Sequence, residues 1–241
     1  MDRVRETVDS AVRRRRAPGR RTPADTPLPA GAPLNVAATW AGTADLGPGW
    51  RSVVWVQGCP FSCPGCMSPD WIPAAPARTV TPAELSAELL ADPAVDGLTF
   101  SGGEPMQQAD GLAEVARLAR RARPGLSVVC FTGHRLERLR AHPPTPGVPR
   151  LLAEVDVLVD GPYVQGRDDG RGLRGSTNQR VHHLTGRLSG SGYDFEDRHR
   201  TAEIAVGGRE AFLIGVPPPD LLTVFDAAVD RSGRSTAWGT P

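Results

Sequence analysis

Three of the four cysteines lie within eight residues, in the segment Cys59-Pro60-Phe61-Ser62-Cys63-Pro64-Gly65-Cys66. This C-x3-C-x2-C spacing lets three thiolates converge on one metal centre. A [4Fe–4S] cluster normally takes four cysteine ligands. The remaining cysteine, Cys130, lies far along the chain and is expected to pack as a buried strand residue. A cluster held by this loop would therefore keep one iron open for a ligand that is not protein.

A structural zinc site is the main alternative for these cysteines. Such sites use C-x2–4-C pairs that a second pair of cysteines or histidines completes. Here Cys130 is single, and His182-His183 has the wrong spacing for a zinc finger. Buried thiols without a ligand are disfavoured because Pro and Gly beside the cysteines indicate a loop. Disulfides are disfavoured because nothing in the sequence suggests secretion.

A second motif, Ser101-Gly102-Gly103-Glu104-Pro105, follows another predicted strand. Paired glycines at the end of a strand allow positive φ and a close approach of the backbone to a ligand. On its own this pattern is equally typical of a tight turn. Its place in the chain, after the three-cysteine loop, is what favours a cofactor site.

Strands and helices alternate through the part of the chain that carries these motifs. We expect strands over residues 34–39, 50–57, 97–100, 126–131 and 155–159, and helices over about 82–91, 110–122 and 134–141. Thr81, Pro82 and Glu84 form a helix start with a capping box, and Asp110 is expected to cap the next helix. The alternation predicts an α/β fold with a parallel sheet, closed as a barrel or open. Its ligands are expected at the C-terminal ends of the strands.

The two ends of the chain differ from this middle part. Residues 1–33 are rich in Arg, Pro and Ala and are expected to form a disordered tail. Residues 188–241 are expected to form an appended extension without a catalytic constellation. Within it, residues 201–206 and 209–215 alternate around Gly207-Gly208 as in a β-hairpin. Asp220 can then cap a helix over residues 221–229, and the end of the chain is expected to be frayed.

Charge and hydropathy narrow the classes of function. The 241 residues include 28 Lys+Arg and 27 Asp+Glu, a formal net charge of +1, so no field of the whole protein favours nucleic acid. No apolar stretch approaches the roughly 18–20 residues of a membrane span, and the N-terminus lacks the apolar core of a secretory signal. We therefore expect a cytoplasmic protein with reduced thiols, and neither nucleic acid nor a membrane as its partner.

The order of the motifs resembles the radical S-adenosylmethionine superfamily, in which the three-cysteine loop precedes a Gly-Gly-Glu-Pro motif. Two later segments closely resemble the activating enzymes of anaerobic (class III) ribonucleotide reductase. They are Asp156-Val157-Leu158-Val159-Asp160-Gly161 and Arg174-Gly175-Ser176-Thr177-Asn178-Gln179-Arg180-Val181-His182-His183-Leu184. Phe131-Thr132-Gly133 occupies the place of that family's aromatic-Thr-Gly motif. The resemblance covers about residues 34–187, which would form the radical SAM domain.

This resemblance implies a partial (β/α) barrel of the radical SAM type, with the cluster at its mouth. Cys59, Cys63 and Cys66 would hold the [4Fe–4S] cluster, and the methionine part of S-adenosylmethionine would chelate the open iron. No catalytic residue is implied besides this cluster-bound cofactor. The implied cofactor-binding residues are Gly65, Cys66, Met67, Gly102, Gly103, Glu104, Thr132 and Asn178. Residues 102–104 would bind the methionyl amine, whereas residues 178–180 could equally brace their own loop.

The implied activity is reductive cleavage of S-adenosylmethionine to methionine and a 5′-deoxyadenosyl radical, which takes a hydrogen atom from a glycine of a partner enzyme. That partner would be a glycyl radical enzyme, first of all anaerobic ribonucleoside-triphosphate reductase, in an activation of the formate C-acetyltransferase-activating type. A flavodoxin- or ferredoxin-type protein would donate the electron. Two alternatives stay open: the same chemistry on a small metabolite or peptide, and a non-catalytic metal-stabilised binding module.

Overall fold

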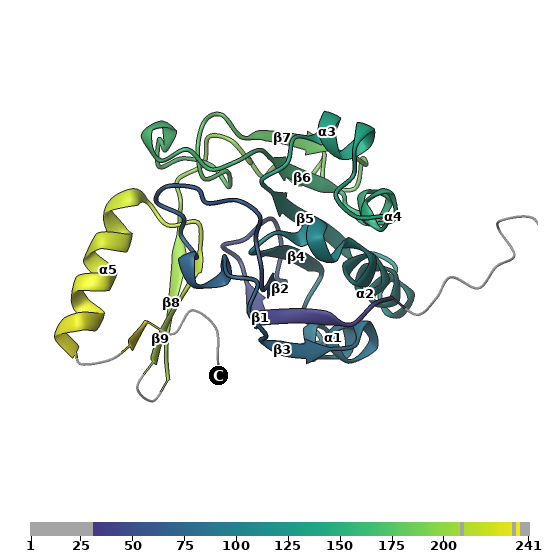
Figure 1. The fold of residues 1–241 in the computed structure, drawn as a ribbon, viewed down its shortest axis with the longest axis horizontal. Helices are drawn as coiled ribbons and strands as arrows, with labels where there is room; N and C mark the ends of the chain where they lie inside the picture. Colours follow the sequence, from purple (N-terminus) through teal and green to yellow (C-terminus); the bar gives the residue numbers. More distant parts are fainter. Residues whose placement is uncertain (1–30, 208–209, 233–234, 237–241) are drawn as a thin grey trace, which may run out of the picture.

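A seven-stranded sheet forms the centre of the molecule, and a smaller three-stranded sheet lies beside it (Figure 1). The computed structural model describes residues 31–207, 210–232 and 235–236. The predicted disordered tail therefore falls almost wholly outside the described residues. In order of pairing, the large sheet contains β3 (Arg78–Val80), β1 (Leu34–Thr43), β2 (Arg51–Val56), β4 (Gly97–Gly102), β5 (Ser127–Thr132), β6 (Val157–Asp160) and β7 (Arg180–His183).

The large sheet is mixed, so the prediction of a purely parallel sheet is wrong. Strands β2, β4, β5 and β6 run parallel, but β1 pairs antiparallel with β2 and β3, and β7 pairs antiparallel with β6. The connection from β1 to β2 explains the first reversal: it spans only residues 44–50, whereas a parallel connection needs about a dozen residues or more. Strands β3 and β7 form the two edges of the sheet.

Helices cover one face of the parallel strands. They are α1 (Pro82–Leu89), α2 (Ala109–Ala122) and α4 (Val148–Glu154), while the short α3 (Leu136–Ala141) follows β5. Helix α1 begins with the predicted capping box between Thr81 and Glu84. The prediction that Asp110 caps α2 is wrong, because a 3₁₀ turn over Pro105–Gln108 leads directly into the helix and Gln108 occupies the cap position.

The central strands are buried on both faces, as is typical of parallel strands. Val54, Phe100, Cys130 and Leu158 are register partners on successive strands, and all four belong to the core under α1, α2 and α4. The alternate residues of the same strands face a second core, which contains Trp55 and residues from outside the sheet. This second face is covered by the loop after β1 and by C-terminal segments of the chain instead of helices.

The C-terminal part forms the predicted hairpin and helix. Strands β8 (Ala202–Gly207) and β9 (Glu210–Gly215) pair antiparallel, and β10 (Ser235–Thr236) adds to β9. Helix α5 (Pro219–Ser232) packs on this sheet through Phe225 and Val229. The turn residues 208–209 and the predicted frayed end beyond residue 236 lie outside the described residues.

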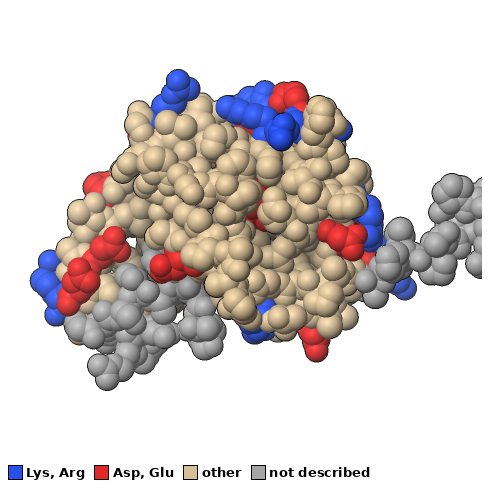
Figure 2. Space-filling view, in the orientation of Figure 1, with Lys and Arg blue, Asp and Glu red and all other residues tan. Residues whose placement is uncertain are grey.

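Basic and acidic side chains are interspersed around the margin of the face shown in Figure 2. The middle of this face carries few charged side chains, in keeping with the net charge of +1. Among the described residues, no helix has the length and apolar character needed to cross a membrane.

Candidate functional site

The predicted site residues meet in one pocket, where β2, β4, β5 and β6 end. This cysteine pocket has a volume of about 150 Å³. It is lined by Cys59, Phe61, Cys63, Cys66, Met67, Ser68, Ser101, Gly102, Gly103, Glu104, Pro105, Phe131, Thr132, Gly133, Gly161, Tyr163 and Gln179. Eight of the predicted positions are in this lining, whereas Gly65 and Asn178 are not.

The cysteine loop, residues 57–72, is closed on itself by backbone hydrogen bonds. The N–H groups of Gly58 and Cys59 donate to the carbonyl oxygens of Trp71 and Ile72, each over 2.9 Å. The Gln57 side-chain amide donates to two further carbonyl oxygens near the end of the loop. This arrangement fixes the two ends of the loop next to each other, so the cysteines are presented from a closed backbone ring.

The three thiols of the loop are three of the four cysteine ligands that a [4Fe–4S] cluster normally takes. The Ser68 N–H points at Cys66 Sγ over 3.5 Å, a contact that a thiolate ligand can accept. Among the described residues, no three His, Cys, Asp or Glu side chains converge tightly enough to hold one metal ion. A [4Fe–4S] cluster binds its thiolates on different iron atoms, so its ligands need not converge on one point. Three thiols in one loop thus suit a [4Fe–4S] cluster with one iron left open.

Burial disfavours the charged thiolate form of two of the cysteines in the metal-free protein. It raises the pKa of Cys59 to about 11 and also raises the pKa of Cys66. Both groups are therefore protonated at neutral pH in the metal-free protein. Because a metal binds the thiolate, loading the loop with iron must release these protons.

The paired glycines let the end of β4 pack directly against the cysteine loop. Gly103 N–H donates to Val56 O over 2.8 Å, and Glu104 N–H donates to Gly58 O over 2.9 Å. Gly102 has a φ of +110°, a value that favours glycine. A Cβ atom on Gly103 would collide with the carbonyl oxygen of Gly58. The two glycines are thus required for backbone packing, whatever ligand they also approach.

Glu104 connects two of the loops that form the pocket. Its side chain is 1% exposed and accepts hydrogen bonds from Met106 N at 2.9 Å, Thr132 Oγ1 at 2.8 Å and Gly133 N at 2.8 Å. Burial raises the pKa of this carboxyl group to about 7, although the three donors oppose the rise. Glu104 therefore braces the loop after β4 against the end of β5.

The residues after β6 mainly brace their own loop. Asn178 donates to Pro162 O over 2.8 Å, and its buried Oδ1 has no partner. Gln179 accepts from Gly175 N over 2.7 Å and donates to Gly161 O over 2.7 Å. These contacts match the loop-brace interpretation of residues 178–179, and they place Gln179 in the pocket wall.

Asp160, at the end of β6, accepts several hydrogen bonds next to this loop. Although burial raises its pKa, hydrogen bonds from Arg180, Leu136 N and His182 together lower it to about 2. His182 Nε2 lies 2.9 Å from Asp160 Oδ2. The histidine thus contributes to an ion-pair network that fixes β7 to β6.

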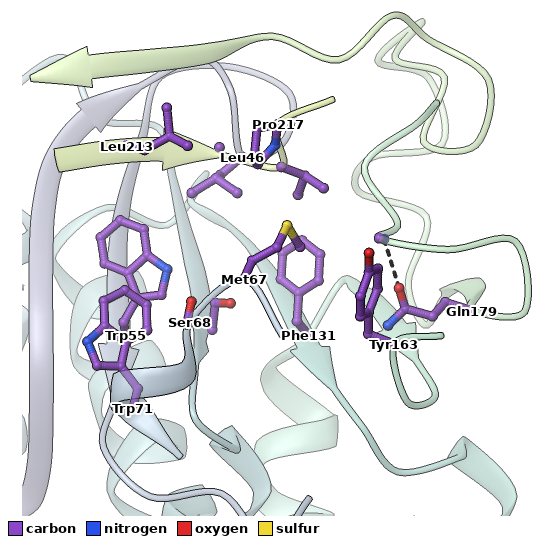
Figure 3. Close-up of a pocket in the computed structure, with 14 residues that line it drawn as sticks. Leu46, Trp55, Met67, Ser68, Trp71, Phe131, Tyr163, Gln179, Leu213 and Pro217 are labelled. Atoms are coloured by element: carbon purple, nitrogen blue, oxygen red, sulfur yellow. Dashed lines mark hydrogen bonds between the residues drawn. The ribbon is translucent and has the colours of Figure 1, made fainter. Parts of the chain in front are cut away.

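A second cavity adjoins the cysteine pocket and reaches the C-terminal hairpin (Figure 3). This hairpin cavity has a volume of about 110 Å³. It is lined by Leu46, Trp55, Met67, Ser68, Trp71, Ser101, Phe131, Tyr163, Gly175, Gln179, Leu213, Gly215, Val216 and Pro217. Six residues belong to both linings: Met67, Ser68, Ser101, Phe131, Tyr163 and Gln179. The part of the hairpin in this cavity could not be predicted, because no spacing rule links residues 213–217 to the cysteine loop.

Comparisons with known proteins agree with the pocket. Residues 46–182 match the family model of the 4Fe-4S single cluster domain. The anaerobic ribonucleoside-triphosphate reductase-activating protein of Escherichia coli (strain K12) is 32% identical over 146 residues, which cover 57% of this chain and 91% of that protein. The pyruvate formate-lyase-activating enzyme of Clostridium pasteurianum is 38% identical over 79 residues, covering 31% of this chain and 33% of that protein.

A search of solved structures matched QueE from Escherichia coli. That match is 16% identical with a TM-score of 0.33, and it covers 42% of this chain and 51% of QueE. A likeness of this size adds nothing to the assignment of the fold.

Proposed function

The chain belongs to the radical S-adenosylmethionine family of glycyl-radical activating enzymes, and we propose that it cleaves S-adenosylmethionine reductively and takes a hydrogen atom from a glycine of a partner protein. One observation carries this proposal. The three cysteines, the Gly-Gly-Glu motif and the Thr-Gly motif line a single pocket at the C-terminal ends of four parallel strands. This is where α/β folds bind their ligands.

Cys59, Cys63 and Cys66 would hold the [4Fe–4S] cluster, leaving one iron open. The reduced cluster would supply one electron to the sulfonium group of bound S-adenosylmethionine, whose C5′–S bond would break to give methionine and a 5′-deoxyadenosyl radical, the species that would take the hydrogen atom. The methionyl amine would bind along residues 102–104. Met67 and Thr132, which line the same pocket, would contact other parts of the cofactor. Gly65 and Asn178 would act by shaping the loops that carry these residues.

The chain's own residues hold the loops around the site together. Phe61 of the cysteine loop packs edge-on against His134, with ring centroids 4.8 Å apart. A Cβ atom on Gly133 would collide with the Phe61 ring, so this contact also needs a glycine. Together with the carboxylate of Glu104, these contacts hold the cysteine loop, the loop after β4 and the end of β5 as one unit.

The relatives suggest a partner. The name of the Escherichia coli protein states that it activates an anaerobic ribonucleoside-triphosphate reductase, and the match covers 91% of it. We therefore propose a glycyl radical enzyme, first of all that reductase, as the partner of this chain. A flavodoxin- or ferredoxin-type protein would donate the electron, and a loop of three unpaired cysteines that would hold the cluster suits a reducing cytoplasm.

The same proposal extends to the domain organisation. Residues 34–187 would form a partial (β/α) barrel, of which the seven-stranded sheet is the open wall, and residues 188–241 would be an extension. The range of the family model, 46–182, lies within the proposed domain and supports this division.

The proposed activity is tested under anaerobic conditions. The protein is reconstituted with iron and sulfide, reduced with dithionite and given S-adenosylmethionine, and the products are analysed for methionine and 5′-deoxyadenosine. We expect both, and with the purified reductase we expect a glycyl radical signal in electron paramagnetic resonance. A correctly assembled cluster that yields no 5′-deoxyadenosine, with or without the reductase, would contradict the proposal. A protein that takes up zinc and no iron or sulfide would instead indicate a binding module.

A small metabolite or peptide is the second candidate substrate. The hairpin cavity favours it, because residues outside the family model wall off one side of the space next to the cysteine pocket. Reductase labelled with deuterium at its glycines separates the two candidates. Deuterium in the 5′-deoxyadenosine indicates the protein partner, and unlabelled 5′-deoxyadenosine formed only with an added metabolite indicates the small substrate.

A further inference from the structure

We propose that the C-terminal hairpin completes the substrate pocket of this enzyme, and that this pocket admits only a small uncharged group. Val216 is the residue to which we assign the control of size. The inference rests on the proposed function, since it concerns the molecule that gives up the hydrogen atom. It concerns residues 213–217, which lie outside the stretch matched by the family model.

The position of the hairpin cavity fits a substrate. Six lining residues are shared with the cysteine pocket, so a group bound in the hairpin cavity lies directly beside whatever occupies the cysteine pocket. Figure 3 shows Leu213 and Pro217 on one side of this space, with Met67 and Phe131 facing them. The cavity is thus bounded by the cysteine loop and β5 on one side and by the hairpin on the other.

The size of the cavity limits what can enter it. An apolar cavity of about 150 Å³ accommodates one benzene molecule, and the hairpin cavity measures about 110 Å³. It therefore takes a group of only a few non-hydrogen atoms. A whole adenosine is larger than this space.

The chemistry of the lining excludes charged groups. None of the described lining residues is an Asp, Glu, Arg, Lys or His. The hydroxyl groups of Ser68, Ser101 and Tyr163 supply polar contacts, and the Gln179 amide is already engaged with Gly175 and Gly161. A phosphate or carboxylate placed here would be desolvated without a counter-charge, which is strongly unfavourable. The pocket therefore selects a neutral group, such as an amide unit or a short aliphatic side chain.

The hairpin wall is fixed in place by packing. Phe212 stacks on Trp40 with ring centroids 6.0 Å apart and meets Trp55 edge-on at 5.5 Å. Ile214 and Val216 are buried in the core on this face of the sheet. Because Phe212 contacts both Trp40 of β1 and Trp55 of β2, the hairpin wall is held at a constant distance from the cysteine loop.

A buried ion pair ties the same wall to the other side of the cavity. Arg200 lies 2.8 Å from Asp168 and also donates to Pro217 O over 3.2 Å. Asp168 in turn accepts a hydrogen bond from the Tyr163 hydroxyl over 3.1 Å. Tyr163 lines both cavities, so the end of the hairpin and the pocket wall belong to one connected network.

Binding to the cluster-free protein tests the chemistry of the cavity without relying on activity. The probes are trifluoroacetamide and trifluoroacetate, which have nearly the same shape but differ in charge, observed by ¹⁹F NMR line broadening. We expect the amide to bind and the carboxylate not to bind. Equal binding of the two probes, or no binding of the amide, would overturn the proposal.

Two variants test the role of Val216. Val216→Phe fills the cavity and should abolish broadening of the amide signal. Val224→Phe is the matched control, since Val224 is 61% exposed on α5 and should leave binding unchanged. If Val216→Phe does not fold, Val216→Ala enlarges the cavity and should admit pentafluoropropionamide, which the wild type excludes. Wild-type binding in a folded Val216→Phe protein, or failure of Val216→Ala to admit the larger amide, would refute the assignment.

Turnover then separates this inference from the proposed function. Val224→Phe should leave both 5′-deoxyadenosine formation and hydrogen transfer unchanged. Val216→Phe should lower hydrogen transfer from the reductase, measured as glycyl radical, by about tenfold or more. A raised KM for S-adenosylmethionine would show that the cavity holds the cofactor and would overturn the inference. If the wild type forms no 5′-deoxyadenosine, the proposed function fails, and the ¹⁹F result still decides the nature of the cavity.

Discussion

The carboxyl group of Glu104 should make the stability of the cluster-free protein depend on pH. Burial raises its pKa from the ordinary value of 4.5 to about 7. A carboxyl group with a higher pKa in the folded than in the unfolded state holds its proton more tightly when folded. Its stabilising contribution is therefore complete below pH 4.5 and is lost as the pH rises through about 7.

The size of this effect follows from the pKa values. Each unit of difference corresponds to about 1.4 kcal/mol, so the full contribution of Glu104 is about 3 kcal/mol. About 2 kcal/mol of it should be lost between pH ~5 and pH ~7.5, because the linkage relation places most of the change in that window. The proton has a suitable acceptor, since Glu104 Oε1 lies 2.8 Å from the Thr132 hydroxyl.

Glu104→Gln removes the titration. The Gln amide group must face one of the donors that the carboxylate now accepts, Met106 N or Gly133 N, and should lose that hydrogen bond at a cost of about 1–3 kcal/mol. Urea unfolding of both proteins, free of cluster and under reductant, gives the free energy of unfolding at each pH. The advantage of the wild type over the variant should shrink by about 2 kcal/mol from pH ~5 to pH ~7.5.

Glu84→Gln is the matched control with the opposite sign. Hydrogen bonds from Thr81 lower the pKa of Glu84, which is fully exposed at the start of α1. The advantage of the wild type over this variant should grow as the pH rises through the titration range of a carboxylate. A difference between the wild type and Glu104→Gln that is constant with pH, or that grows with pH, would refute the assignment of a raised pKa to Glu104.

Three further predictions concern the cluster loop and the extension. Cys63→Ala should abolish both cluster assembly and cleavage of S-adenosylmethionine, whereas Cys130→Ala, in the buried strand β5, should leave both nearly intact. Analyses of iron, sulfide and 5′-deoxyadenosine check both variants. An active Cys63→Ala protein would contradict the ligand assignment. Asp168→Asn leaves the buried Arg200 guanidinium without its carboxylate and should lower the free energy of unfolding by about 3–5 kcal/mol. Urea unfolding measures this difference, and an unchanged free energy of unfolding would show that the ion pair is dispensable. Gly103→Ala places a methyl group against a carbonyl oxygen of the cysteine loop and should reduce iron incorporation, and full iron loading would show that the loop can yield.

The central strands could be predicted from the sequence to within two residues or so. Strands β2, β4, β5 and β6 are buried on both faces, so each contains a mostly apolar run, interrupted in β4 by Thr99, that ends at a polar residue. The start of α1 was equally predictable, because its capping box depends only on residues three positions apart. In both cases the signal is local, and the surrounding fold does not alter it.

Other elements depend on contacts that are distant in the sequence. Strand β7 carries polar residues, so no apolar pattern predicts it. It is held in place by its pairing with β6 and by a hydrogen bond to the Asp160 carboxylate. Helix α4 is not among the predicted helices because it begins in a proline-rich segment, although a proline in the first turn is compatible with a helix start. The direction of β1 was missed because the length of its connection to β2, not its composition, decides the pairing.

The candidate site shows the same division. The cysteines and the paired glycines could be found because their spacing reflects one loop and one backbone approach. Tyr163 could not be assigned to the pocket, and for Gln179 a place beside the cofactor and a brace of its own loop stayed equally open. Both residues come from an irregular segment whose course is set by its own hydrogen bonds. The hairpin residues were missed for a stronger reason, since they reach the cavity from a separate sheet.

The way the pocket is fixed explains where substrate selectivity has to come from. The loops that would hold the cluster and the cofactor are held together largely by backbone contacts that require glycine, and by one buried carboxylate. Such contacts leave little scope for substitution, so they cannot readily be changed to suit a different substrate. The hairpin wall contributes side chains instead, and Val216 can change in size without disturbing the backbone packing of the cysteine loop. A fixed cofactor site beside an adjustable wall is therefore the arrangement through which an enzyme with this pocket would be matched to its own substrate.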